Sequence, residues 1–209
     1  MATLRISSLT ITLPGGQNLC NDLSFEVAAG EVLALTGPSG SGKSSILAWL
    51  TGTLDSAITS EGQAFLDTHE LTHLPTEKRK LGLMLQQNYL FPHMSVGQNL
   101  LFGLPSGPRR TRWQSVCDSL ESAGLSGMEN RDPETLSGGQ SARVSLLRTL
   151  LSEPEALLLD EPFSRLDRDR RARIREFTWS SAAALPVLLV THDEEDIPDG
   201  ARHVSLANS

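Results

Sequence analysis

The chain has 209 residues, 39% of them hydrophobic, which is enough for one domain with a sizeable core. It carries 18 Lys and Arg against 25 Asp and Glu, a net charge of -7, so its charge disfavours a nucleic-acid partner. Its 2 cysteines lie far apart in sequence, which argues against a zinc site or a disulfide framework. No apolar run reaches the roughly 20 residues needed to span a bilayer, and the N-terminus lacks the apolar stretch of a signal peptide.

The first third of the chain predicts strands followed by one helix. Residues 4–13 and 23–27 alternate apolar and polar side chains, as half-buried antiparallel strands do, with a turn at 14–18. Residues 32–35 are continuously apolar, which is typical of a strand buried on both faces, and residues 43–50 have a helical pattern. This order is strand, loop, helix.

The middle of the chain predicts a helical subdomain at about 88–135. Ser95 is expected to cap a helix that runs to Leu104, and Thr111 one that runs to Ala123. Residues 1–87 and 136–209 are expected to form the β-layer and the catalytic core of one domain, 1–209. Buried-strand patterns at 156–159 and 187–190, with a helix between them, complete a parallel α/β core.

The loop between the buried strand and the first helix reads GPSGSGKSS and matches the P-loop pattern. Its glycines let backbone N–H groups point at phosphate oxygens, and the helix that follows adds the positive end of its dipole. Lys43 is expected to reach the β and γ phosphates, and Ser44 to bind Mg²⁺. The predicted triphosphate site comprises Gly37, Pro38, Ser39, Gly40, Ser41, Gly42, Lys43, Ser44 and Ser45.

Two adjacent carboxylates, Asp160 and Glu161, follow the apolar run at 157–159. Ligands of parallel sheets bind at such strand ends, so Asp160 is a candidate for Mg²⁺ and Glu161 for the base that polarises the attacking water. A solvated turn is the alternative for two such residues taken alone.

A second anion-binding sequence, LSGGQ, occupies residues 136–140. Ser137 is expected to cap a helix there, and the two glycines expose backbone N–H groups.

The motifs GPSGSGKSS, LSGGQ and LLLDEP, in this order, resemble those of the ATP-binding subunits of ABC transporters. The resemblance covers nearly the whole chain. It implies an α/β fold: a P-loop NTPase with a RecA-like parallel-sheet core, an N-terminal antiparallel β-layer and an inserted helical subdomain. It also implies ATP and Mg²⁺ as cofactors, hydrolysis of ATP, and head-to-tail pairing of two subunits. In such a pair Ser137, Gly139 and Gln140 would act on the nucleotide of the other chain.

The resemblance assigns three further residues. Gln86, with Gln87 as its alternative, corresponds to the glutamine that contacts Mg²⁺ and the attacking water. Asp167 resembles the residue that couples the two sites, and His192 the histidine that contacts the γ-phosphate. Glu161, His192, Gln86 and Lys43 are thus the expected catalytic residues, and Ser44, Gln86 and Asp160 the expected metal-binding ones.

The chain departs from the family at the adenine site. The family places an aromatic residue where this chain has Leu13 or Pro14, so weak discrimination between ATP and GTP is expected. Only 17 residues follow His192, which resembles the short subunits of thiamine-like small-solute importers.

The expected partners follow from this resemblance. They are a second copy or a paralogue, permease subunits that would dock at residues 89–96, and an extracytoplasmic solute-binding protein. The expected location is the cytoplasmic face of a bacterial inner membrane. The alternatives are an exporter or lipid-releasing complex and a soluble ABC protein without a transport role.

Overall fold

The computed structural model describes residues 2–206, and these form two sheets and a group of helices. An antiparallel sheet has the strand order β2-β1-β4-β5, made of β1 (Thr3–Thr12), β2 (Asn18–Ala28), β4 (Thr59–Leu66) and β5 (His69–Glu70). The buried residues of β1 alternate along the strand, as the sequence predicts, because one face of this sheet lies on the core.

The second sheet has the order β6-β7-β8-β3-β9. Its strands are β3 (Val32–Thr36), β6 (Leu81–Met84), β7 (Ala156–Asp160), β8 (Val187–Val190) and β9 (Arg202–Ser205). β8 pairs in parallel with both β7 and β3, and every residue of β8 is buried. Asp160 and Thr36 therefore end parallel strands at the same edge, which places the loops that follow them close together.

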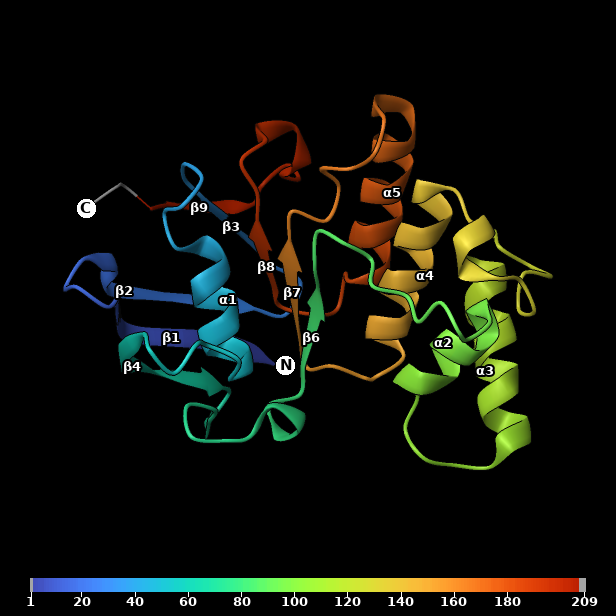
Figure 1. Cartoon of the computed structure of the whole chain (residues 1–209), viewed down its shortest axis with the longest axis horizontal. Coiled ribbons are helices and arrows are strands. Elements are labelled where there is room, and N and C mark those ends of the chain that lie inside the picture. Colours follow the sequence, from blue (N-terminus) through green and yellow to red (C-terminus); the bar gives the residue numbers. More distant parts are fainter. Residues whose placement is uncertain (1, 207–209) are drawn as a thin grey trace. The chain divides into compact units, whose positions relative to one another are not determined.

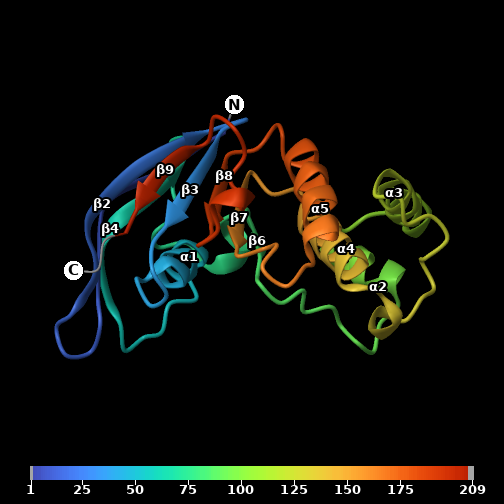
Figure 2. The same ribbon diagram turned by 90° about the horizontal axis from the view of Figure 1, so that it is seen from above.

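Helix α1 (Lys43–Thr51) lies between these sheets, as Figure 2 shows. Its buried side chains Ile46, Leu47 and Leu50 pack in one hydrophobic cluster with residues of β1, β2, β3, β7 and β8. Gly52 ends the helix in the left-handed conformation, at φ 76°, which glycine adopts without steric cost. The start of α1 is therefore fixed against both sheets.

Four helices build the second group of elements (Figure 1): α2 (Val96–Gly103), α3 (Arg109–Ser122), α4 (Gly138–Leu150) and α5 (Arg168–Ser181). Short 3-10 turns occur at Thr76–Lys78, Pro133–Thr135 and Glu194–Asp196. Residues of α2, α3 and α4, among them Val96, Leu100 and Val116, share one buried cluster. None of the helices in residues 2–206 combines the length and the hydropathy that a membrane span needs.

The chain divides by contacts into two compact units. The first runs up to Leu83, includes Glu155–Glu161 and resumes at Ala182; the second comprises Met84–Pro154 and Pro162–Ser181. The helical unit thus contains α4 and α5 together with the stretch 88–135. The expected split of 1–87 and 136–209 from 88–135 stays a proposal about how the domain is organised.

Helix starts test the capping predictions directly. Ser95 and Ser137 each form a capping box with the glutamine three residues on, as their sequences predict. The prediction that Thr111 caps α3 is wrong, because the helix begins at Arg109 and Pro108 is its N-cap. Proline has no N–H to satisfy and its fixed φ suits the entry to a helix.

Candidate functional site

The P-loop residues form a turn that only glycine allows at its sharpest points. Gly37, Gly40 and Gly42 have φ values of 149°, 83° and 90°. A Cβ atom on Gly37 would lie 2.7 Å from the carbonyl oxygen of Leu206, so a larger residue does not fit. Gly42 is the N-cap of α1 and supplies no side chain, so the first N–H groups of the helix have no capping acceptor. Such a helix start binds anions.

Lys43 is the first residue of α1, and only 7% of it is exposed. Its Nζ donates to the carbonyl oxygens of Gly37 at 2.7 Å and Pro38 at 2.8 Å, and to Oγ of Ser41 at 3.5 Å. The ammonium group is therefore held inside the curve of the loop. Phosphate oxygens in that curve would take over these contacts, because they are stronger acceptors for a cation than neutral carbonyls.

Ser44 and Asp160 meet between α1 and the end of β7. Oγ of Ser44 donates to Oδ1 of Asp160 at 3.3 Å. Burial raises the pKa of Asp160 above the ordinary value of 3.8, the hydrogen bond from Ser44 lowers it, the charge of Glu161 raises it and the charge of Lys43 lowers it. A hydroxyl and a carboxylate side by side are the oxygen ligands that suit Mg²⁺.

The donor set fits a magnesium ion that takes its other ligands from phosphate and water. Among residues 2–206 no cluster of three or more His, Cys, Asp or Glu side chains could hold a metal by itself. Mg²⁺ in nucleotide sites is commonly held by one or two protein oxygens and by phosphates, so Ser44 and Asp160 suffice.

Glu161 and His192 form the second pair in this unit. Oε1 of Glu161 lies 2.9 Å from Nδ1 of His192, and the His192 side chain is 57% exposed while that of Glu161 is 22% exposed. Because an ionised carboxylate only accepts hydrogen bonds, Nδ1 carries the proton, and Nε2 is left to face a substrate. Glu161 has φ 45°, an uncommon conformation for a residue with a side chain.

The first unit therefore brings together the loop 37–45, Asp160, Glu161 and His192, all of which the sequence singles out. A hydroxyl, two carboxylates and an imidazole lie around an anion-binding helix start. This arrangement can bind a polyphosphate, hold a divalent cation and activate a water molecule, which is the chemistry of nucleotide hydrolysis.

Other predicted site residues lie in the helical unit. Nε2 of Gln86 donates to Oγ of Ser164 at 3.2 Å, and both residues belong to that unit. Ser164 is a contact that the sequence analysis missed. Its position three residues after Glu161 was the only available signal, and serine at that spacing is too common to be read as a site.

The LSGGQ sequence starts α4. Oγ of Ser137 accepts from the backbone N–H of Gln140 at 3.4 Å, and Oε1 of Gln140 accepts from the N–H of Ser137 at 2.9 Å. Gly138 is exposed and Gly139 is buried, and a Cβ on Gly139 would be 3.8 Å from Cδ of Arg170. The amide oxygen of Gln140 is thus used within the helix cap.

Asp167 precedes α5 and caps its start. Its Oδ1 accepts from the backbone N–H of Arg170 at 3.0 Å, and its Oδ2 lies 3.2 Å from Nε of the same arginine. Both side chains of this ion pair are more than half exposed, so the contact orients Asp167 more than it stabilises the fold.

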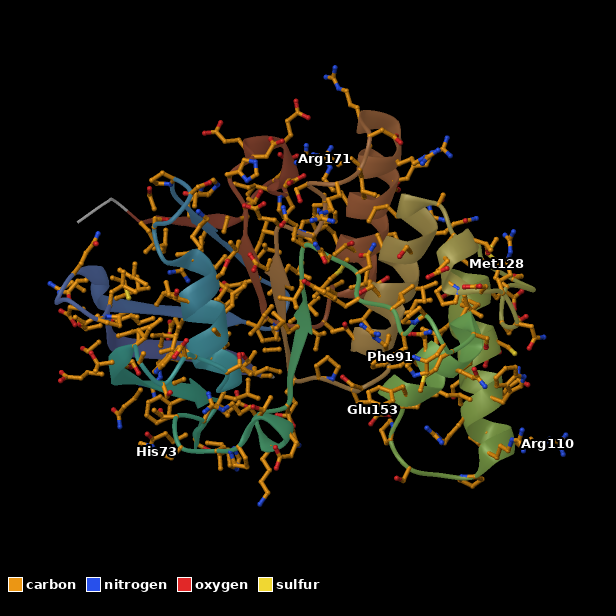
Figure 3. The ribbon with its side chains drawn as sticks, in the orientation of Figure 1. His73, Phe91, Arg110, Met128, Glu153 and Arg171 are labelled. Atoms are coloured by element: carbon orange, nitrogen blue, oxygen red, sulfur yellow. The ribbon has the colours of Figure 1, made fainter. Side chains whose placement is uncertain are left out.

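A groove of about 370 Å³ lies in the helical unit, lined among others by Gln86, Tyr89, Leu90, Pro92 and Arg165. Tyr89 is 60% exposed and Phe102 is 66% exposed. Phe91 packs edge-on against Phe102 with ring centroids 4.9 Å apart, and Figure 3 shows Phe91 beside α2. Within the stretch 89–96 predicted to meet a partner, Tyr89 and Pro92 are exposed at this groove, whereas Val96 is buried in the core of the helical unit.

Two buried polar groups hold the irregular segment beside the groove. Nδ2 of Asn99 donates to the carbonyl oxygens of Phe91, Met94 and Ser95 at 3.1 to 3.2 Å. The guanidinium group of Arg148 donates to the carbonyl oxygens of Tyr89 and Asn88 and lies 5.3 Å from the Phe91 ring centroid. The segment is rigid without being a helix or a strand.

Comparison with known proteins identifies the family of this chain. A family model described as ABC transporter matches residues 20–164. An ABC transporter ATP-binding protein of Escherichia coli K12 is 43% identical, over 98% of this chain and 95% of the relative. Sulfate/thiosulfate import ATP-binding proteins are 39% identical in Nephroselmis olivacea, over 89% of this chain and 54% of the relative, and in Xanthomonas campestris, over 90% and 56%. The chain thus spans about half the length of these import proteins.

Proposed function

Because the chain belongs to the ABC transporter family, as an ATP-binding and ATP-hydrolysing subunit, we propose that ATP is held by the loop Gly37 to Ser45 and hydrolysed with Glu161 as the base. The observation that carries this assignment is the grouping of an uncapped helix start, Lys43, and the pairs Ser44–Asp160 and Glu161–His192 in one unit. Each group has a role in phosphoryl transfer to water.

The proposed steps use the chain's own groups. The N–H groups at the start of α1 and the ammonium of Lys43 would bind the phosphates, and Ser44 and Asp160 would hold Mg²⁺, which would neutralise charge on the phosphate oxygens. Glu161 would accept the proton of the attacking water, and His192, held by Glu161, would contact the γ-phosphate. Gln86 is proposed to contact the metal and the water.

The same proposal includes a second subunit. The N–H groups of Ser137 and Gln140 are used in the capping box, so these two residues would donate from the Ser137 hydroxyl and the Gln140 side-chain amide. Together with the backbone N–H of Gly139 and the dipole of α4, these donors suit the γ-phosphate bound by another chain. Two copies paired head to tail would then form two composite sites with closed two-fold symmetry, and Asp167 would connect them.

We also propose that the chain works as the peripheral energy-coupling subunit of a bacterial small-solute importer, on the cytoplasmic face of the membrane. The support is the open groove lined by Tyr89, Leu90 and Pro92 and the relatives named for sulfate/thiosulfate import. The groove would receive a helix of a permease subunit, and a solute-binding protein would deliver the solute. An inorganic oxyanion is the solute class to test first.

The ATP site is tested with Lys43→Ala, measured as Mg²⁺-dependent ATP hydrolysis and as nucleotide affinity. Lys78→Ala is the matched control, because Lys78 is an exposed lysine of the same unit. Lys43→Ala should lose ATP hydrolysis and nucleotide binding, while Lys78→Ala should keep both. Equal activity of the two variants would refute the loop assignment.

The docking proposal is tested by expressing the chain with the permease gene that neighbours it and purifying the pair in mild detergent. Tyr89→Glu should lose the permease and keep basal hydrolysis, because Tyr89 is an exposed residue of the groove that the proposed mechanism does not use. If both Tyr89→Glu and the wild type retain the permease, the groove is excluded as the docking surface.

A further inference from the structure

Arg79 is a buried cation in the nucleotide-binding unit that the proposed mechanism does not use. It lies between the 3-10 turn at Thr76–Lys78 and strand β6, and only 6% of it is exposed. Burial lowers the pKa of its guanidinium group. A buried charge is costly unless it is paired, so its partners indicate what it does.

All the described partners of Arg79 are backbone carbonyl oxygens. Nη1 donates to Trp49 at 2.8 Å and to Leu50 at 2.7 Å, both in the last turn of α1. Nε donates to Leu74 at 2.7 Å and Nη2 to Thr72 at 3.0 Å. No described carboxylate pairs with it. The guanidinium therefore joins the end of α1 to the chain that leads into β6.

The last turn of α1 has no basic residue of its own, so Arg79 supplies the cation at this helix end. The carbonyl groups at a helix end carry partial negative charge, which a cation stabilises. Gly52 leaves room for it: a Cβ on Gly52 would lie 2.8 Å from Nη2 of Arg79. Residue 52 is thus constrained both by its left-handed backbone and by the guanidinium.

The other end of the same helix is the proposed phosphate site. Helix α1 has 9 residues and is about 13 Å long, so a shift of its C-terminal end moves its first N–H groups as one rigid body. We infer that Arg79 is a positioning residue for nucleotide binding, which fixes α1 so that its N-terminal N–H groups and Lys43 meet the phosphates. This inference rests on the proposed role of the loop 37–45.

A cavity next to Arg79 makes the inference testable by chemical rescue. It has a volume of about 330 Å³ and is lined by Arg79 and by residues that include Trp49, Asp55 and His73. Figure 3 shows His73 at the outside of this unit, so the cavity is reached from the surface. A small guanidinium compound can therefore enter where a shortened side chain leaves space.

The experiment uses the full chain with Arg79→Ala and, as a matched arginine loss in the same unit, Arg202→Ala, whose side chain is 54% exposed. We expect Arg79→Ala to weaken ADP binding and raise the KM for ATP about tenfold, with kcat within about threefold of wild type. Ethylguanidinium at a non-denaturing concentration should restore ADP affinity, and ethylammonium should not, because only the planar group bonds several carbonyls at once. Arg202→Ala should bind ADP as the wild type does.

Unchanged ADP affinity in folded Arg79→Ala would overturn the inference, as would equal rescue by ethylammonium. If circular dichroism shows that Arg79→Ala does not fold, Arg79→Lys takes its place in the experiment. This variant keeps the positive charge but loses the planar guanidinium group that bonds several carbonyls, so its ADP affinity should still fall. Lys43→Ala tests the phosphate loop separately. If Lys43→Ala loses ADP binding and the Arg79 variants do not, the positioning role of Arg79 is refuted while the assignment of the phosphate loop stands.

Discussion

The Nδ1 atom of His192 lies 2.9 Å from Oε1 of Glu161 and so fixes the direction of the carboxylate that follows β7. The contact links the ends of two parallel strands, β7 and β8, which pair in register through Asp160 and Val190. The proposed base and its partner thus directly follow neighbouring strands of the core sheet, which fixes their positions relative to each other.

The Glu161→Gln substitution keeps the shape of the side chain and removes its basicity. We expect kcat for ATP to fall at least about 10²-fold with nucleotide affinity retained, because the phosphates are bound by other groups. An ATP-bound dimer should accumulate, detected by size-exclusion chromatography. Glu61→Gln, at an exposed position of strand β4, is the control. Hydrolysis at the wild-type rate would refute the role of Glu161.

His192→Ala should lower kcat about 10²-fold and leave ADP affinity unchanged, since Glu161 loses its orienting partner and the γ-phosphate loses a contact. His203→Ala removes an exposed imidazole from β9 and should have no effect. Comparable loss in both variants would mean that His192 has no special part in the reaction.

Asp160→Asn should stabilise the nucleotide-free protein at pH 7 by about 0.5–2 kcal/mol while it weakens Mg²⁺-dependent ATP binding. The folded protein raises the pKa of Asp160, mainly by burial, so ionisation of this carboxylate opposes folding. Wild type therefore loses stability relative to the variant as the pH rises from below 3.8 to above the raised pKa. Urea unfolding at pH 7 and pH 4 measures this difference, which should shrink at the lower pH. If the difference in unfolding free energy between wild type and Asp160→Asn is the same at pH 7 and pH 4, the raised pKa of Asp160 is contradicted.

Leu13→Tyr should increase the preference for ATP over GTP. In the wild type, Leu13 begins the turn between β1 and β2, where its N–H donates to the carbonyl of Gln17, and no aromatic residue is present at 13 or 14. We expect the wild-type ratio of kcat/KM for ATP and GTP to be within about tenfold, and base stacking in the variant to add about 1 kcal/mol or more for adenine. A strong wild-type preference for ATP would be contrary to this.

The two serine capping boxes allow a matched comparison. Ser95→Ala and Ser137→Ala should each lower the free energy of unfolding by about 1 kcal/mol, measured with urea. Only Ser137→Ala should also impair ATP-dependent dimer formation, because only the start of α4 is proposed to meet a second nucleotide. Equal dimer formation by both variants would remove Ser137 from the interface.

Sequence reasoning succeeded where one residue type satisfies one physical need. The apolar run of β3, the glycines of the loop 37–45 and the serines that cap α2 and α4 each have a local signal. Strands β4, β5, β6 and β9 were not predicted, because they are short or polar and are strands only because neighbouring strands pair with them.

Within the site, contacts between distant segments escaped prediction. The hydrogen bond between Gln86 and Ser164 and the four carbonyl partners of Arg79 follow from the fold, and no spacing in the sequence announces them. The proposed role of Asp160 could be predicted, but its raised pKa could not, because burial is a property of the folded chain.

Position 161 has a backbone conformation that glycine or asparagine would adopt more readily than glutamate. A substitution that relieves the backbone strain at this position would therefore remove the carboxylate. A relative with glycine or asparagine at this position is therefore expected to keep the fold and to lose the proposed base, and with it the hydrolysis of ATP.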